Sequence, residues 1–218
     1  MAMVSHELKT PITSQNAYLQ FMLRNARLSG DQKLEDMLEK SLRQVRNMTS
    51  MIDGFLNISR LDSGKMLLDQ SAFDLKSLFS ELEDEIHSTV HTHRVVFEQA
   101  ESINLYADRE KISQVIHNLI SNAVKYSPIG SDINISYSIS AKGTISIRVK
   151  DNGMGIGEQD QEQIFERYYR IKSPTMGSIA GFGIGLYLCR EIIELHKGKI
   201  RIESSEGSGA TFIIELPS

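Results

Sequence analysis

The second half of the chain contains three segments rich in asparagine or glycine: HNLISNAVKYS at 117–127, DNGMGIG at 151–157 and GFGIGL at 181–186. A predicted helix contains the first, a predicted strand ends at the second, and a predicted helix begins at the third. Glycines let backbone N–H groups approach a polyanion, and a helix N-terminus adds favourable partial positive charge. The three segments together predict a pocket for a purine nucleoside triphosphate.

Predicted strands and helices are mixed on both sides of these segments. Helices are expected at 74–91, 109–126 and 183–196, and strands at 94–98, 103–107, 134–139, 144–149, 199–204 and 210–216. Asp108 precedes the second of these helices as a suitable N-cap. Gly143 separates two segments that alternate apolar and polar residues. This order favours an α/β sandwich, in which helices cover one face of a mostly antiparallel sheet.

The first 62 residues lack strand-like alternation and are expected to form two long helices. Ser29-Gly30-Asp31 supplies a stop signal and an N-cap between them. The first helix carries Leu8, Ile12, Leu19, Met22 and Ala26 on one side, and the second repeats apolar residues in steps of four and three at Leu34, Leu38, Val45, Met48, Ile52 and Phe55. Two helices cannot bury a wide apolar stripe alone, so we expect a second hairpin to complete a dimeric four-helix bundle.

The segment LDSGK at 61–65 is expected to end the second helix and to act as a hinge. We therefore divide the chain into a helical hairpin at 1–62, a hinge at 63–69 and a mixed domain at 70–218. The chain begins in what reads as the middle of a helix, which indicates a fragment. No stretch approaches the roughly 20 apolar residues that span a bilayer. This portion is expected to be cytoplasmic, with any membrane anchor in a missing upstream segment.

Composition excludes several classes of function. The formal net charge of −4 argues against general nucleic-acid binding, which needs a basic face. The single cysteine, Cys189, rules out an intrachain disulfide framework and fits a reducing compartment. Because Cys189 lies in an apolar helical run, we expect a buried structural thiol rather than a nucleophile.

The glycine-rich segments differ from other known phosphate-binding motifs. GFGIGL has neither the glycine spacing of a dinucleotide fingerprint nor the Gly-Lys-Ser/Thr of a Walker A loop. In DNGMGIG, Asp151 ends a strand, where its carboxylate can accept a hydrogen bond from an exocyclic amine and so select adenine over guanine. Gly153 and Gly155 leave room for a ring to approach the backbone. Alone, each segment would be read as an ordinary turn.

The asparagine-rich segment places several polar side chains on one face of a helix. Asn118 and Asn122 are four residues apart, and Lys125 lies one turn beyond Asn122. An amide oxygen is a suitable ligand for Mg²⁺, which keeps several waters and bridges phosphates. Lys125 can offset phosphate charge, and Tyr126 can pack on a purine. The alternative is the polar side of an amphipathic helix, which is how we interpret His117.

Near the amino terminus, SHELKTPI at 5–12 contains a candidate nucleophile, His6. A neutral imidazole nitrogen can attack phosphorus, and the adjacent Glu7 can hold its tautomer and stabilise positive charge. Pro11 removes one helical N–H bond and bends the helix. The alternative is a surface histidine without a role, which is our interpretation of the four histidines outside these motifs, His87, His91, His93 and His196.

With these motifs in this order, the chain resembles bacterial sensor histidine kinases of two-component systems. Residues 70–218 are similar to the catalytic ATP-binding domain, in the gyrase-type (Bergerat) ATPase fold. Residues 1–62 are similar to the dimerisation and histidine-phosphotransfer hairpin. The resemblance implies an α+β protein that uses ATP and Mg²⁺, forms a homodimer, phosphorylates His6, and passes the phosphoryl group to an aspartate of a response-regulator receiver domain.

The resemblance also implies roles for individual residues. Asn122 would be the Mg²⁺ ligand. Asp151 would bind the adenine amine. Residues 158–180 would form a lid, which Phe165 in IFERYYR at 164–170 would anchor. Arg167 or Arg170 would reach from this lid to the γ-phosphate. The remaining nucleotide-binding positions would be Asn118, Lys125, Gly181, Gly183, Gly185 and Leu186 around the phosphates, and Tyr126, Gly153, Gly155, Ile156 and Thr211 around the base.

The phosphoacceptor motif carries a second implication. In the family, the spacing H-E-x-x-T, here His6 to Thr10, accompanies hydrolysis of the regulator's phosphoaspartate; otherwise Thr10 merely tolerates its place in the helix. Two other functions use the same residues: an ATPase-like clamp that changes shape on binding nucleotide, and a scaffold that dimerises without turnover. The hairpin with SHELKTPI argues against the clamp, and the intact Asn122 and Asp151 argue against the scaffold.

Overall fold

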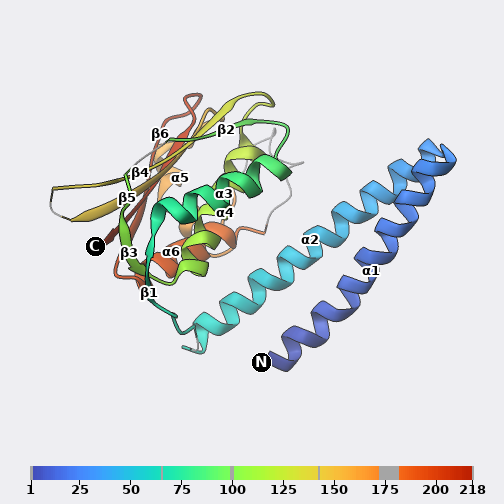
Figure 1. Ribbon diagram of the computed structural model, residues 1–218, viewed down its shortest axis with the longest axis horizontal. Helices are drawn as coiled ribbons and strands as arrows, with labels where there is room; N and C mark the ends of the chain where they lie inside the picture. The colour runs from blue at the N-terminus through green and yellow to red at the C-terminus, as the bar shows by residue number, and fades with distance from the viewer. Residues whose placement is uncertain (1, 65, 99–100, 142, 172–181, 218) are drawn as a thin grey trace. The chain divides into compact units, whose positions relative to one another are not determined.

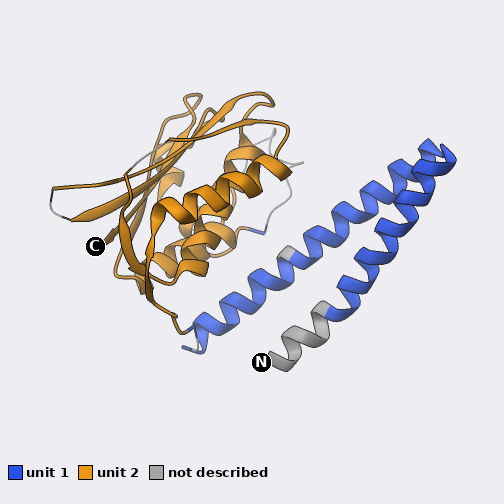
Figure 2. Cartoon of the chain, in the orientation of Figure 1, with its two compact units in different colours: residues 1–66, 180–182 blue, residues 67–179, 183–218 orange. Residues whose placement is uncertain are grey.

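The computed structural model of the protein describes the backbone of residues 2–64, 66–98, 101–141, 143–171 and 182–217, and their side chains except those of 2–9 and Ser50. The chain divides into two compact units (Figure 2), residues 1–66 with 180–182 and residues 67–179 with 183–218. In the described part of the chain, no helix is both long enough and apolar enough to cross a membrane.

The first unit is a hairpin of two helices, α1 (Ala2–Ser29) and α2 (Gln32–Asp62). The predicted stop and cap between them are confirmed. Gly30 adopts a positive φ of 72°, which a residue with a side chain rarely tolerates. The Asp31 carboxylate accepts a hydrogen bond from the Leu34 amide at 3.0 Å. Across the turn, Arg27 donates to Glu35 and Glu39, each at 2.9 Å.

The apolar residues of α2 form two neighbouring stripes rather than the single stripe predicted. One stripe is buried against α1 and contains Leu38, Leu42, Val45 and Leu56. The other is exposed and contains Leu34, Met37, Met48, Met51 and Phe55. The predicted series of apolar residues, spaced four and three apart, contained members of both stripes. This happened because residues next to each other in the sequence lie on adjacent faces of a helix, so a shift of one residue moves the series from one stripe to the other. In one copy of the chain the second stripe is therefore uncovered.

The second unit is built on a five-stranded sheet in the order β2-β4-β5-β7-β6. Its strands are β2 (Arg94–Phe97), β4 (Asp132–Ile139), β5 (Thr144–Asp151), β6 (Lys199–Ser204) and β7 (Ala210–Pro217). All neighbours are antiparallel except β2, which runs parallel to β4. Two further strands, β1 (Ser71–Asp74) and β3 (Asn104–Ala107), pair in a separate antiparallel sheet. The sequence analysis did not predict β1.

Three helices, α3 (Leu75–Thr89), α4 (Arg109–Tyr126) and α6 (Gly185–Leu195), cover one face of the larger sheet (Figure 1). The short α5 (Glu158–Gln161) and the 3-10 helix η1 (Gln163–Phe165) follow β5. Helix α4 buries a stripe with helical spacing, at Ile112, Val115, Ile116, Leu119, Ile120 and Ala123. The predicted α/β sandwich is confirmed, and α4 lies at its centre with its polar residues along the edges of that stripe.

Asp108 ties the start of α4 to two distant segments. Its carboxylate accepts from the Lys111 amide at 3.1 Å, which confirms the predicted N-cap, and also from the Asp69 amide at 3.0 Å. Its own amide donates to His196 Nε2 at 2.9 Å, while His196 Nδ1 lies 2.7 Å from the Ile192 carbonyl. His196 is therefore held as the neutral tautomer with its proton on Nδ1. This buried histidine, to which the sequence analysis gave no role, joins the end of α6 to α4.

Replacing His196 with leucine should destabilise the second unit. The substitution leaves the buried Asp108 N–H without an acceptor, which costs about 1–3 kcal/mol of unfolding free energy. Urea unfolding of His196→Leu would measure this loss. His91 lies on an exposed loop, so His91→Leu is the matched control and should change stability by less than about 0.5 kcal/mol. Equal midpoints for the two variants would contradict the prediction.

Candidate functional site

Asp151, the last residue of β5, is buried and presents one free carboxylate oxygen. Its Oδ1 accepts hydrogen bonds from the Gly153 amide at 2.8 Å and the Ala210 amide at 3.3 Å. Among the described residues, no hydrogen bond reaches Oδ2. Burial raises the pKa of Asp151, and the two amide bonds partly offset that rise. The backbone thus fixes the carboxylate by one oxygen and leaves the other as an acceptor.

The turn after Asp151 is packed so closely that its glycines cannot be replaced without a shift. A Cβ on Gly153 would lie 2.7 Å from both the Asp151 Oδ1 and the Tyr126 carbonyl oxygen. Gly155 has a φ of 71°, and its Cβ would overlap the carbonyl oxygen of Ser205. This packing brings Tyr126, at the end of α4, against the Asp151 turn. Residues that are predicted to surround the nucleotide base, and that are far apart in the sequence, therefore lie close together in the structure.

Asn118 lies on α4 about two turns before Tyr126, and it packs against the start of α6. A Cβ on Gly185 would lie 2.5 Å from Asn118 Oδ1, so only glycine allows the two helices to approach this closely. The Asn118 Nδ2 donates to Cys189 Sγ at 3.1 Å. Burial raises the pKa of the Cys189 thiol to about 12, so Cys189 stays protonated at neutral pH. The predicted burial of Cys189 is confirmed.

Helix α4 connects these two clusters. Asn118 and Tyr126 are eight residues apart, which corresponds to about 12 Å along the axis. Asn122 lies between them and is half-buried, and no hydrogen bond to its side chain is found in the described part of the chain. Lys125 is exposed as a whole residue, although desolvation of its ammonium group lowers its pKa. His117, on another side of the helix, lies 3.3 Å from Glu85.

Two segments that flank residues 172–181, which belong mostly to the predicted lid, are held together through their backbones. Phe165 is buried and packs edge-to-face on Phe212, with ring centroids 6.3 Å apart. The Tyr168 amide donates to the Gly183 carbonyl at 2.8 Å, and both residues have positive φ. A Cβ on Gly183 would lie 2.6 Å from the backbone of Tyr168 and Tyr169. Gly183 thus packs against the backbone of Tyr168 and Tyr169, while residues 172–181, with Gly181, lie outside the described part.

The two candidate lid arginines are both exposed and both have partners. Arg167 donates to the Tyr187 hydroxyl at 2.6 Å, and its guanidinium carbon lies 4.6 Å from the centre of the Tyr187 ring. Tyr187 is on α6, as are Leu186, which is half-buried, and Arg190, which pairs with Glu166 at 3.2 Å. These contacts fasten Glu166 and Arg167, within the predicted lid, to α6.

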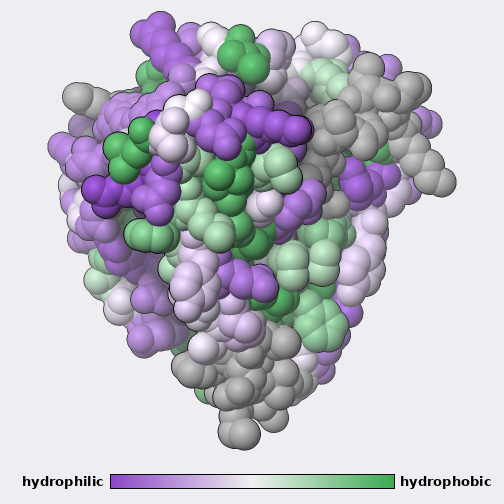
Figure 3. Space-filling view, turned by 90° about the vertical axis from the view of Figure 1, so that its right-hand side faces the viewer, coloured by the Kyte–Doolittle hydropathy of each residue, from purple (hydrophilic) through white to green (hydrophobic). Residues whose placement is uncertain are grey.

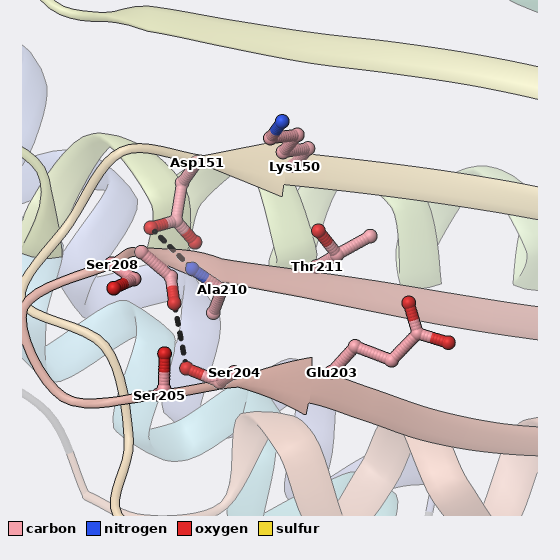
Figure 4. Close-up of a pocket in the computed structure, with 9 residues that line it drawn as sticks. Lys150, Asp151, Glu203, Ser204, Ser205, Ser208, Ala210 and Thr211 are labelled. Carbon is pink, nitrogen blue, oxygen red and sulfur yellow. Dashed lines mark hydrogen bonds between the residues drawn. The ribbon is translucent and has the colours of Figure 1, made fainter.

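Beside Asp151, the ends of three strands form an open hollow of about 320 Å³ (Figure 4). Its lining includes Lys150, Thr211 and Glu203, which lie in one row across β5, β7 and β6. Asp151 pairs with Ala210 in the next row. Because side chains alternate along a strand, Thr211 points to the opposite face of the sheet from Asp151. The group on β7 that contacts the Asp151 carboxylate is therefore the Ala210 amide and not the Thr211 side chain.

Sequence reasoning missed a group of residues that support this turn. Ser204 Oγ accepts from the Ile156 amide at 2.9 Å and donates to the Gly209 carbonyl at 2.6 Å. Gln161 donates to the carbonyls of Ile156 and Ser204. Ile156 is thus held through its backbone. No motif signals such contacts, because they depend on a sheet pairing between segments about 50 residues apart.

On the hairpin, His6 and Glu7 lie in helix α1, but their side chains are outside the described residues. Thr10 is exposed on the same helix. The Ser14 hydroxyl donates to the Thr10 carbonyl at 3.2 Å.

Two family models match this chain. Residues 107–218 match the model described as "Histidine kinase-, DNA gyrase B-, and HSP90-like ATPase". Residues 1–64 match the "His Kinase A (phospho-acceptor) domain". The chain belongs to the sensor histidine kinases. The predicted family is confirmed.

Relatives of this histidine kinase align along its whole length. Sensor histidine kinase WalK of Bacillus subtilis is 32% identical over 220 residues, which are 100% of this chain and 36% of WalK. Sensor-like histidine kinase SenX3 of Mycolicibacterium smegmatis is 31% identical over 226 residues, again 100% of this chain and 56% of SenX3. The chain thus spans about half of these relatives or less.

A solved structure agrees with the fold. The Acinetobacter baumannii histidine kinase AdeS superposes with a TM-score of 0.63 at 26% identity, and the match covers 97% of each chain.

Proposed function

We propose that this chain is the cytoplasmic core of a sensor histidine kinase that phosphorylates itself on His6 with ATP and then passes the phosphoryl group to an aspartate on a response regulator. The observation that carries the proposal is the course of α4. At one end Tyr126 touches the Asp151 turn, and two turns earlier Asn118 touches the start of α6. The same chain carries SHELKTPI on a separate helical hairpin.

Adenine recognition is assigned to the free Oδ2 of Asp151. A carboxylate accepts hydrogen bonds only, so it matches the exocyclic amine of adenine and opposes the carbonyl at the same position of guanine. The tight turn at Gly153 and Gly155 keeps side chains away from the base, and Tyr126 and Ile156 border that space. The Ala210 amide, rather than the Thr211 side chain, supports Asp151.

Phosphate binding is assigned to the start of α6 with the polar face of α4. Helix α6 is 11 residues long and opens at Gly185, so its first amides are free to face an anion. Lys125 supplies positive charge. We assign Asn122 as the Mg²⁺ ligand. In the described residues no cluster of three or more His, Cys, Asp or Glu side chains could hold a metal. This agrees with an ion that is held largely by the substrate's phosphates.

The reaction proposed for His6 is a direct displacement at phosphorus. A neutral ring nitrogen of His6 bonds to the γ-phosphorus as the bond to the β–γ bridging oxygen breaks, and ADP leaves with that electron pair. Glu7 stabilises the imidazolium that forms. Bound Mg²⁺ would neutralise charge on the phosphates. A receiver-domain aspartate then takes the phosphoryl group from His6.

Residues 158–180 are assigned as the lid over the nucleotide, with Phe165 as its anchor. In the structure Arg167 contacts Tyr187 on α6, and either Arg167 or Arg170 would reach the γ-phosphate. The domain division proposed is 1–62 for phosphotransfer and dimerisation, 63–69 for the hinge and 70–218 for catalysis. It places the two reacting groups on different domains.

The chain is expected to be a homodimer through residues 1–62, with the exposed stripe of α2 at the interface. Figure 3 shows apolar patches, in green, on one face of the molecule, and the exposed apolar residues of the hairpin include Phe21, Met48 and Phe55. Burying such side chains in a four-helix bundle contributes about 1.5–3 kcal/mol each. Sedimentation should show a dimer at micromolar concentration. Phe55→Glu should shift it towards monomer, whereas Arg46→Glu, on the opposite side of α2, should not. A monomeric parent would refute the dimer.

Phosphatase activity towards the regulator is assigned to Thr10, which lies one helical turn beyond His6 with an exposed side chain. Its hydroxyl could orient a water towards a docked phosphoaspartate. Thr10→Ala should therefore slow dephosphorylation of the cognate regulator, while His6 still accepts phosphate. Thr13→Ala makes the same change about one turn further on and should leave both activities intact. Loss of both activities in Thr10→Ala would instead indicate a damaged helix near Pro11.

The whole proposal is tested by incubation with γ-labelled ATP. We expect label on the chain that is labile in acid and stable in base, as phosphohistidine is and phosphoserine is not. An ATPase-like clamp would release labelled phosphate and leave the chain unlabelled. A scaffold without turnover would do neither, and either result would refute the kinase.

A further inference from the structure

Cys189 on α6 and Asn118 on α4 form a hydrogen bond between their side chains, and both helices border the proposed nucleotide site. The Asn118 Nδ2 lies 3.1 Å from Cys189 Sγ, and the sulfur lies 3.9 Å from the Val115 carbonyl oxygen. Cys189 is 2% exposed, so neither solvent nor a reagent competes for the sulfur. The proposed mechanism gives this thiol no role.

The direction of these bonds decides how the Asn118 amide is turned. The thiol proton points to the Val115 carbonyl, which can only accept. The sulfur is then left as an acceptor, so it receives an N–H from Asn118. A flipped Asn118 amide would place its oxygen against the sulfur, and the thiol could satisfy that oxygen only by giving up its contact with Val115. Its carbonyl oxygen is then the amide atom nearer to the start of α6, since a Cβ on Gly185 would lie 2.5 Å from Oδ1 and 2.9 Å from Nδ2.

We propose that Cys189 is a positioning residue that makes Asn118 present its carbonyl oxygen, and not its NH₂ group, at the phosphate end of the nucleotide site. The inference rests on the proposed function of that site. An amide oxygen cannot hydrogen-bond a phosphate oxygen, because both are acceptors. The partner of Asn118 is then a donor, and a water held by a bound Mg²⁺ ion would supply one. Phosphate contacts are left to the α6 amides and Lys125.

The test compares Cys189→Ser and Cys189→Ala. A serine hydroxyl can donate to Val115 and accept from Asn118 as the thiol does, whereas alanine removes the acceptor. The affinity for a nonhydrolysable ATP analogue is measured with and without Mg²⁺. Loss of one neutral hydrogen bond corresponds to about a threefold to tenfold change. We expect Cys189→Ala to lose that factor from the Mg²⁺-dependent gain in affinity only, and Cys189→Ser to keep the parent value.

A second readout does not depend on nucleotide. The side-chain NH₂ signals of Asn118, assigned from their absence in Asn118→Ser, should shift in Cys189→Ala and stay near the parent position in Cys189→Ser. Ile193→Val removes a similar volume from the same buried face of α6 and should change neither readout.

Two results would overturn the proposal: unchanged Asn118 signals and Mg²⁺ dependence in Cys189→Ala, or an equal loss in both cysteine variants. A parent protein that binds no ATP would refute the proposed function instead, while the NMR comparison would still decide whether Cys189 orients Asn118.

Discussion

Replacing His6 with glutamine is expected to abolish phosphorylation of this chain while leaving its affinity for ATP within about twofold of the parent value. A glutamine side chain has no nitrogen lone pair that can attack phosphorus, because its amide nitrogen is delocalised into the carbonyl. Asn118, Asp151 and Ala210 belong to the other compact unit, so the substitution leaves the sequence of that unit unchanged. Autoradiography after incubation with γ-labelled ATP would measure the first effect, and titration with a fluorescent ATP analogue the second.

His91→Gln is the matched control for this experiment. It makes the same chemical change at an exposed histidine outside every motif, and it should retain full labelling. Label that persists in His6→Gln would identify another acceptor residue and refute the assignment of His6. Loss of nucleotide affinity together with labelling would contradict the prediction and would mean that His6 also affects nucleotide binding.

Features set by local sequence were predictable. The helix α4 was predicted to its boundaries, because its apolar residues repeat with helical spacing and Asp108 can cap only the helix that follows it. The turn at Gly30 and Asp31 was predictable for the same reason. In each case, the residues that determine the structure lie within a few positions of it.

Features set by pairing across the chain were not predictable. β1 is only four residues long, and its partner β3 lies about 30 residues later. The parallel pairing of β2 with β4 breaks an otherwise antiparallel sheet, and no periodicity reports strand direction. The two stripes of α2 could not be separated from one sequence, since both are apolar and only packing shows which one α1 covers.

The candidate site shows the same division. Asp151 and the asparagines of α4 could be found because side-chain chemistry and spacing identify them. The partners that fix them are backbone amides, such as that of Ala210, or distant side chains, such as Cys189. Every residue except proline has a backbone N–H, so residue type does not show which amide will bind a side chain. A cysteine in an apolar helix cannot be told from other core residues by sequence. Sequence therefore located the groups that would touch the nucleotide but not those that orient them.

Replacing Asp151 with asparagine is expected to reduce ATP affinity by about 30- to 700-fold, which corresponds to about 2–4 kcal/mol. The Asp151 Oδ1 accepts from two backbone amides, and Oδ2 remains for the adenine amine. An asparagine oxygen can replace only one of these atoms. If it faces the amides of Gly153 and Ala210, the NH₂ group opposes the adenine amine, and if it faces adenine, the NH₂ group opposes both amides. Isothermal titration with a nonhydrolysable ATP analogue would measure the loss.

The pH dependence of binding separates this role of Asp151 from a structural one. Burial raises the pKa of Asp151, so the parent should begin to lose ATP affinity at a higher pH than an ordinary aspartate would require. With Oδ1 occupied by two N–H donors, the added proton goes to Oδ2 and turns the acceptor for adenine into a donor. Asp151→Asn should lack this titration. Asp84→Asn, the same change at an exposed position on α3, should keep both the affinity and the pH profile of the parent. If Asp151→Asn bound ATP as tightly as the parent and with the same pH profile, a different residue would read the base.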